Sequence, residues 1–202
     1  MRLRRVAAIL LIIWSRAVAQ EDSFKPRLSD APLTNEQIAV YRAVLKDYLK
    51  GSDGVLNLAN ITAPIDWSDQ TCFEGIAAGV IEESKSVIHR ILPSFVANTK
   101  IVLVDPDTQQ KIIDKNDPQN LMKKAIEGHQ KVTDEQLNNA IEGAFGSALF
   151  ELSEIAFDKE HRRAVVSYSF VCSELCGNGN TLVLRKVGQS WKVARRCGGW
   201  VS

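Results

Sequence analysis

Residues Leu149–Arg196 read "LFELSEIAFDKEHRRAVVSYSFVCSELCGNGNTLVLRKVGQSWKVARR". Apolar residues recur here at every second position, which is the period of a β-strand with one buried face. The pattern predicts strands over 149–157, 163–171, 181–187 and 191–196, separated by the turns 158–162 and 188–190 and by the segment that holds two cysteines. Short links between successive strands are typical of antiparallel pairing. The sequence therefore predicts a four-stranded antiparallel meander.

The strand over 163–171 shows the alternation most clearly. One face would carry Ala164, Val166, Tyr168 and Phe170, and the other would carry Val165, Ser167, Ser169 and Val171.

Helical signals precede these strands. Thr34 with Gln37, and Thr133 with Gln136, have the spacing of a capping box, which satisfies the free amides of a first helical turn. We expect helices over 34–51, over 118–128 and after Thr133, with one or two more over 69–92. Residues 55–61 look like a short strand, and 100–107 like a strand or buried coil. The predicted fold class is α+β, with N-terminal helices packed on one face of the four-stranded C-terminal meander.

Part of the chain resembles a protein family. The block "ELSEIAFDKEHRRAVVSYSFVCSELCGNGNTLVLRKVGQSWKV" resembles the C-terminal block of a widespread group of uncharacterised secreted bacterial proteins, and "VYRAVLKDYLKG" with "NLANIT" is similar to their opening helix and strand. Ala156 stands where the group tends to have glycine. The shared motifs are structural, so the resemblance implies no activity.

The first residues predict export. A basic start, "MRLRR", is followed by the apolar run Val6–Ile13 and by Ala17 and Ala19, the small residues of a cleavage site. This is the layout of a secretory signal peptide over 1–19. Arg16 ends the apolar run well short of the roughly 20 residues that span a bilayer, so no membrane span is expected after cleavage. A loose leader over 20–33 and a single domain over 34–202 would follow, secreted or periplasmic.

Charge is unevenly distributed along the chain. Without residues 1–19, the protein has 21 basic and 24 acidic side chains, yet residues 159–202 carry eight basic side chains against two acidic ones. A possible anion-binding face would be formed by Arg162, Arg163, Arg185, Lys186, Lys192, Arg195 and Arg196. An anionic envelope polymer or an acidic protein would be its partner, and no nucleic acid is expected. The same charges would equally offset the acidic helical part or keep an edge strand soluble.

Four cysteines in an exported chain favour disulfides. Cys172 and Cys197 would lie on strands separated by a third strand, about 9.5 Å apart, which is too far for a direct bond. We favour a bond between Cys172 and Cys176, closing a glycine- and asparagine-rich turn, with Cys72 bonded to Cys197. The alternative joins Cys176 to Cys197 and Cys72 to Cys172.

The sequence matches known catalytic and metal-binding motifs poorly. Cys172 and Cys176 are separated by three residues and lead into a strand, whereas a redox Cys-x-x-Cys motif opens a helix. No metal-ligand spacing is present, and "DPDTQQKIIDKND" (105–117) lacks the third acid and the glycine of a calcium loop. Nucleophile-elbow and dinucleotide motifs are also missing. We therefore expect no cofactor and no metal, and a non-catalytic binding or structural module of the cell envelope. An envelope hydrolase, with a site assembled from dispersed residues, is the alternative.

Overall fold

The computed structural model describes residues 25–51, 53–97 and 99–202. The expected signal peptide and the first part of the expected leader lie outside them. Within the described part of the leader, β1 (Arg27–Leu28) pairs in parallel with β3 (Val87–Ile88). This pairing ties residues that we expected to be loose to the rest of the domain.

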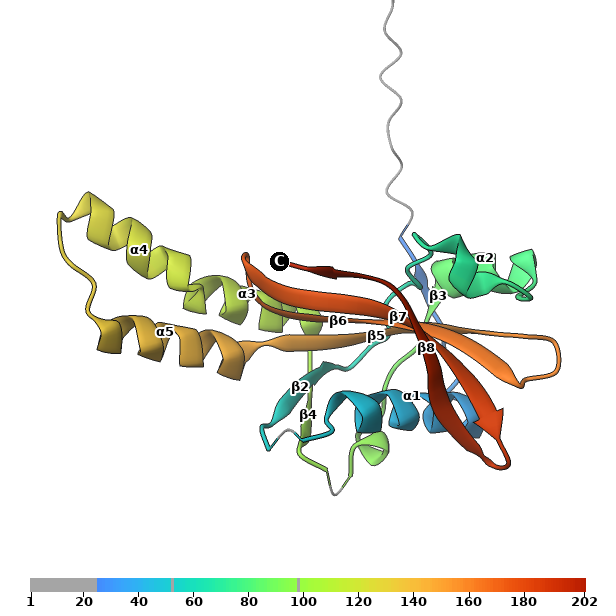
Figure 1. The fold of residues 1–202 in the computed structure, drawn as a ribbon. Helices are drawn as coiled ribbons and strands as arrows, with labels where there is room; N and C mark the ends of the chain where they lie inside the picture. The colour runs from blue at the N-terminus through green and yellow to red at the C-terminus, as the bar shows by residue number, and fades with distance from the viewer. Residues whose placement is uncertain (1–24, 52, 98) are drawn as a thin grey trace, which may run out of the picture.

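A mixed six-stranded sheet with the strand order β4-β2-β5-β6-β7-β8 forms the centre of the fold (Figure 1). Its last four strands are β5 (Leu149–Phe157), β6 (Arg163–Ser173), β7 (Cys176–Val187) and β8 (Ser190–Val201). They form the antiparallel meander that the alternating pattern predicted. β2 (Leu56–Ala59) and β4 (Ile101–Val104) extend it, because β2 pairs in parallel with both β4 and β5. The α+β class is confirmed, but the sheet is larger than the expected four strands.

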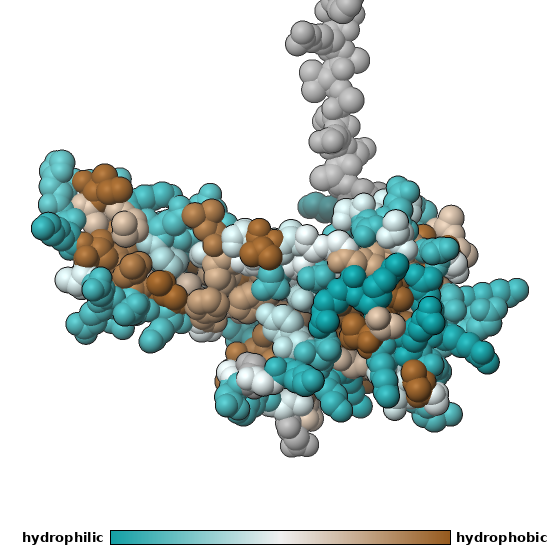
Figure 2. Space-filling view, in the orientation of Figure 1, coloured by the Kyte–Doolittle hydropathy of each residue, from teal (hydrophilic) through white to brown (hydrophobic). Residues whose placement is uncertain are grey.

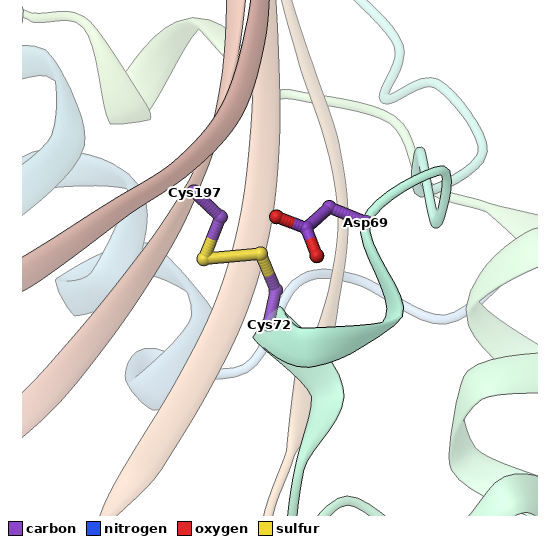
Figure 3. A group of neighbouring side chains, drawn as sticks. All are labelled: Asp69, Cys72 and Cys197. Atoms are coloured by element: carbon purple, nitrogen blue, oxygen red, sulfur yellow. A yellow bond between two sulfur atoms is a disulfide. The ribbon is translucent and has the colours of Figure 1, made fainter.

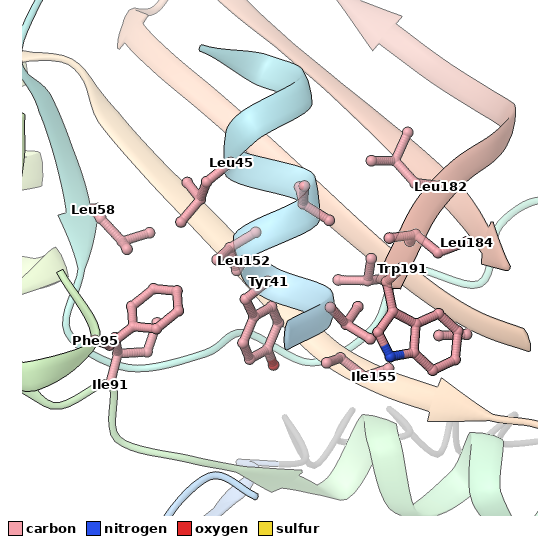
Figure 4. Close-up of a cluster of buried hydrophobic side chains, with 14 of the residues drawn as sticks. Tyr41, Leu45, Leu58, Ile91, Phe95, Leu152, Ile155, Leu182, Leu184 and Trp191 are labelled. Atoms are coloured by element: carbon pink, nitrogen blue, oxygen red, sulfur yellow. The ribbon is translucent and has the colours of Figure 1, made fainter. Parts of the chain in front are cut away.

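One face of the sheet is covered by α1 (Asn35–Tyr48). Thr34 and Gln37 form the predicted capping box at its start. Tyr41 and Leu45 belong to the main hydrophobic core, which also contains Leu152 and Leu182 (Figure 4). The alternation in β6 is confirmed on this side, where Ala164, Val166, Tyr168 and Phe170 all contact this core.

The opposite face is covered by α2 (Ala78–Ser86) and the 3-10 turn η1 (Gln70–Phe73). Phe73 and Ile81 pack there against Val165 and Val183. Val165 lies between two residues that face α1, so these clusters occupy opposite sides of the sheet. The expectation that helices cover only one face was therefore wrong. The expected helical region over 69–92 is also shorter, because α2 ends at Ser86.

Three further helices lie at one end of the sheet (Figure 1): α3 (Pro106–Asn116), α4 (Pro118–Glu127) and α5 (Asp134–Ser147), which leads almost directly into β5. The sequence did not predict α3. Asp105 is its N-cap, since its carboxylate accepts a hydrogen bond from the Thr108 amide at 2.8 Å. Hydrogen bonds from Thr108 also hold the pKa of Asp105 below its usual value. Among the described residues, no helix has both the length and the apolar character needed to cross a membrane.

Candidate functional site

The first disulfide joins the covering layer to the sheet. Cys72 in η1 and Cys197 in β8 are bonded, with their Cα atoms 6.0 Å apart, and the Asp69 carboxylate lies beside them (Figure 3). This carboxylate accepts hydrogen bonds from the backbone and hydroxyl of Thr71 and from the Gly198 amide. These bonds lower the pKa of Asp69, the Thr71 hydroxyl having the largest effect. The three side chains cluster as potential metal ligands do. Both sulfurs are bonded to each other, however, so neither offers a thiolate, and the cluster is a structural clamp.

The second disulfide joins Cys172 to Cys176 across the β6–β7 turn, with their Cα atoms 5.2 Å apart. The structure thus contains the pairing that the sequence favoured. Two disulfides indicate an oxidising compartment, as found outside the cell or in the periplasm.

We expected the glycines after Cys176 to be part of the turn, but the structure places them in a strand. The turn consists of Glu174 and Leu175, and the glycine- and asparagine-rich segment already belongs to β7. Neither Gly177 nor Gly179 has a positive φ angle. A Cβ atom on Gly179 would collide with the Trp200 indole on the neighbouring strand. Glycine at these positions therefore leaves room for the Trp200 indole to pack against β7.

Two of the seven basic residues lie on the α1 face of the sheet and are paired. Lys186 forms an ion pair with Glu36 at 2.6 Å, and Arg196 pairs with Asp47. Glu36 also accepts a hydrogen bond from His161. These partners, Lys186 first, lower the pKa of Glu36.

Two more basic residues hold η1 in place on the opposite face. The Arg163 guanidinium donates to the carbonyl oxygens of Cys72 and Glu74, and the Arg195 guanidinium donates to that of Thr71. The seven basic residues therefore do not form one face, and these two serve the fold.

The three remaining basic residues are Arg162, Arg185 and Lys192. Within the part of the chain that the structure describes, no hydrogen bond or ion pair engages their side chains. Arg185 and Lys192 are direct partners across β7 and β8, so their side chains point to the same side of the sheet. Of the seven residues of the expected anion-binding face, Arg185 and Lys192 thus lie side by side with side chains that have no other partner in the described structure.

A polar site lies where β5 is irregular. The pairing of β5 with β6 shifts register between Leu152 and Ile155, which marks a β-bulge. Bulges redirect side chains and are common beside functional sites. Here Glu154 is turned away from the apolar core clusters and is only 4% exposed. Its backbone amide donates a hydrogen bond to the carbonyl oxygen of Ala63 at 2.7 Å. The bulge thus fixes a buried carboxylate at the edge of the core.

This carboxylate is satisfied by two donors from other segments. The Thr62 hydroxyl donates to it, and His89 donates through Nδ1 at 2.9 Å. The backbone amide of His89 in turn donates to the Thr62 hydroxyl oxygen at 2.7 Å. Because Nδ1 faces Glu154, Nε2 is the ring atom of His89 that remains for a ligand. Nearby, burial and the charge of Glu154 raise the pKa of Tyr41 well above its usual value.

A pocket of about 440 Å³ opens beside His89 and Glu154, between α1, α2 and the end of β5. Val80, Ile155 and Phe157 give it apolar walls, Glu83 and Asp158 add carboxylates, and Lys159 adds one basic side chain. His161 lies at the pocket as well and stacks on Phe157 with ring centroids 4.8 Å apart. The site therefore combines apolar contact area with a few oriented polar groups, as small-molecule sites do.

Sequence reasoning did not find His89, Glu154 or Thr62. One signal was present in "LFELSEIAF": the core-facing residues Phe150 and Leu152 are two apart, whereas Ile155 follows Leu152 by three. This break in the alternation indicates a bulge at Ser153–Glu154. No local pattern indicated that His89, 65 residues away, would meet Glu154.

Comparison with protein-family models, with curated proteins and with solved structures found no match.

Proposed function

We propose that this protein is a non-catalytic binding module of the cell envelope, and that its site is the pocket beside His89 and Glu154. One observation carries the proposal: a buried carboxylate orients the imidazole through Nδ1 at 2.9 Å, at the wall of a pocket of about 440 Å³. Fixing a polar group in advance lowers the entropic cost of binding a ligand to it.

The polar groups define the chemistry of the ligand. Because Nδ1 donates its hydrogen to Glu154, a neutral His89 offers a lone pair at Nε2. Glu83 offers carboxylate oxygens on the same pocket wall. Both groups accept hydrogen bonds, so they favour a ligand rich in N–H or O–H donors. Val80 and Phe157 would cover its carbon atoms. A small amine or amino sugar fits this description.

The hydroxyl groups near the site favour binding over catalysis. Thr62 donates to Glu154, and Ser84 donates to the backbone carbonyl of Val80. Among the described residues, no serine, threonine or cysteine donates a hydrogen bond to the His89 ring. A nucleophile paired with its base, the usual mark of covalent catalysis, is thus missing from this part of the chain.

Thermal unfolding with small ligands tests the proposal. Ethanolamine, 1,4-diaminobutane and glucosamine are compared with acetate and succinate. A ligand at about 100 times its Kd stabilises a protein by about 2.7 kcal/mol, which is several degrees in Tm at this chain length. We expect at least one amine to raise Tm in the wild type and not in His89→Gln or Glu83→Gln. Glu135→Gln, on the exposed side of α5, is the matched control and should keep the response. If the amines leave Tm unchanged, or act equally on all variants, the pocket does not bind them.

A hydrolase is the second candidate, because Glu154 and His89 also have the arrangement of an orienting acid and a general base. Water activated at Nε2 would be the nucleophile. Chromogenic p-nitrophenyl esters, phosphates and glycosides distinguish the two functions. Turnover that is lost in His89→Gln and retained in Glu135→Gln would overturn the non-catalytic proposal.

An anionic envelope polymer stays a separate prediction for the Arg185–Lys192 pair. Salt-dependent retention on an anionic matrix should fall in the double variant Arg185→Glu with Lys192→Glu. No hydrogen bond or ion pair in the described structure engages either side chain, so the double substitution breaks no such contact of the fold. If retention is unchanged in the double variant, this pair does not bind an anionic polymer.

A further inference from the structure

The helical arm, defined as α4, α5 and the β6–β7 turn, exposes a set of apolar side chains. They gather on its surface in Figure 2. Met122 and Ile126 come from α4, Ile141 and Phe145 from α5, and Leu175 from the turn. Ile126 is 71% exposed and Leu175 is 70% exposed. α4 has no buried residue at all. A contiguous exposed apolar surface of this kind is a feature of interaction sites.

The spacing of these residues forms a groove. Met122 and Ile126 are four apart on α4, and Ile141 and Phe145 are four apart on α5, so each helix presents one apolar stripe. A hollow of about 330 Å³ between the helices is lined by Met122 of the first stripe, by Ile141 and Phe145 of the second, and by Ala144 and Leu175. Two packed helices with such a hollow between them can accept a third helix, whose apolar face fills the groove.

The charges around the groove indicate the chemistry of that helix. Residues 117–147, which include the two helices of the arm and the residues that flank them, carry together with Glu174 six acidic side chains against three basic ones, a net charge of −3. The acidic residues are Asp117, Glu127, Asp134, Glu135, Glu142 and Glu174. Asp117 lines the groove directly. Glu174, beside Leu175, accepts a hydrogen bond from Gln119, which also lines it. Asp117 and Glu174 thus form an acidic rim of the groove. A second copy of this chain, docked arm to arm, would bring one acidic rim against another and is disfavoured.

We propose that the groove of the helical arm binds a basic amphipathic helix of a partner protein. The apolar stripe of that helix would lie between α4 and α5, and its lysine or arginine side chains would face the acidic rim. This surface lies at the α4–α5 end of the sheet and shares no lining residue with the pocket beside His89.

A model peptide tests this inference. The probe is a fluorescein-labelled 18-residue amphipathic helix of leucine and lysine, and the comparison peptide has glutamate at every lysine position. Binding to the full chain is followed by fluorescence anisotropy. We expect the leucine–lysine peptide to bind at least tenfold more tightly than the leucine–glutamate peptide. Equal affinity for the two peptides would overturn the basic partner.

Substitutions locate the binding surface. Leu175→Glu removes an exposed side chain of the groove, and Val55→Glu changes a residue that is 66% exposed outside the arm. We expect Leu175→Glu to weaken binding at least tenfold and Val55→Glu less than twofold. Each variant adds one negative charge, so a purely electrostatic attraction would become stronger in both. If Leu175→Glu binds the peptide as tightly as the wild type does, the groove is not the binding site.

Two further measurements complete the test. Met122→Glu repeats the substitution on α4 and should weaken binding as Leu175→Glu does, so the test stands if one variant fails to fold. Light scattering after size exclusion gives the oligomeric state. A wild-type dimer that Leu175→Glu converts to a monomer would show that a second copy occupies the groove, against the inference.

Discussion

The two disulfides allow a matched test of how a cross-link stabilises this fold. Each consists of one fully buried cysteine, Cys72 or Cys172, and one half-buried cysteine, Cys197 or Cys176. Replacing both members of a pair by alanine therefore removes similar buried volume in the two cases. What differs is the loop that each bond closes, with a sequence separation of 125 residues in one case and 4 in the other.

The magnitudes follow from loop closure in the unfolded chain. Closing the long loop stabilises the fold by about 5 kcal/mol, and closing the short loop by about 2 kcal/mol. Cys72→Ala with Cys197→Ala should thus lower the free energy of unfolding by about 3 kcal/mol more than Cys172→Ala with Cys176→Ala. At this chain length the difference corresponds to roughly 6–12 °C in Tm.

Urea denaturation of the two double variants, extrapolated linearly to water, measures the difference directly. Two double variants within about 1 kcal/mol of each other, or the opposite order, would refute loop closure as the main source of stabilisation. The stability of the bonds would then come from contacts in the folded state.

Two further predictions concern the sheet and its core. Gly179→Ala should lower the free energy of unfolding by about 1–3 kcal/mol, because its Cβ would meet the Trp200 indole. The cost should be smaller in a Trp200→Ala background, where only the contact of the added Cβ with the Tyr168 carbonyl oxygen at 3.0 Å remains, and denaturation of the four proteins of the cycle would show this. Tyr41→Phe leaves the Ser153 carbonyl without its 2.8 Å hydrogen bond and should cost about 1–3 kcal/mol near neutral pH. Since burial raises the pKa of Tyr41, its contribution is complete below pH 10 and is lost as pH rises further. Wild type and Tyr41→Phe should therefore converge in stability at alkaline pH, and a constant difference would contradict this view.

Local signals predicted much of the fold. The capping boxes at Thr34 and Thr133 mark the starts of α1 and α5, because each box satisfies amides that are adjacent in sequence. The alternation over 149–196 predicted all four strands of the meander, since its partners follow each other closely along the chain. β8 runs five residues beyond the expected end at Arg196. The glycines there do not alternate with apolar residues, so the pattern gave no sign of this extension.

Non-local pairing accounts for most of what was missed. β2 and β4 were recognisable as short apolar runs, but β2 joins β5 across about 90 intervening residues, and a parallel pair leaves no turn signal between its strands. The same holds for the site. Glu154 is positioned by a bulge that the sequence could have indicated, whereas its donors Thr62 and His89 arrive through tertiary packing alone.

The short disulfide also affects the order in which bonds can form. During synthesis Cys72 emerges first and remains without a nearby thiol until Cys172, 100 residues later. Cys176 then follows after four residues, and so short a loop closes far more readily than one of 100 residues. Oxidation of the hairpin thus removes both thiols that compete with Cys197 for Cys72. The bond at the β6–β7 turn thus prevents Cys72 from pairing with Cys172 or Cys176 and leaves it available for Cys197.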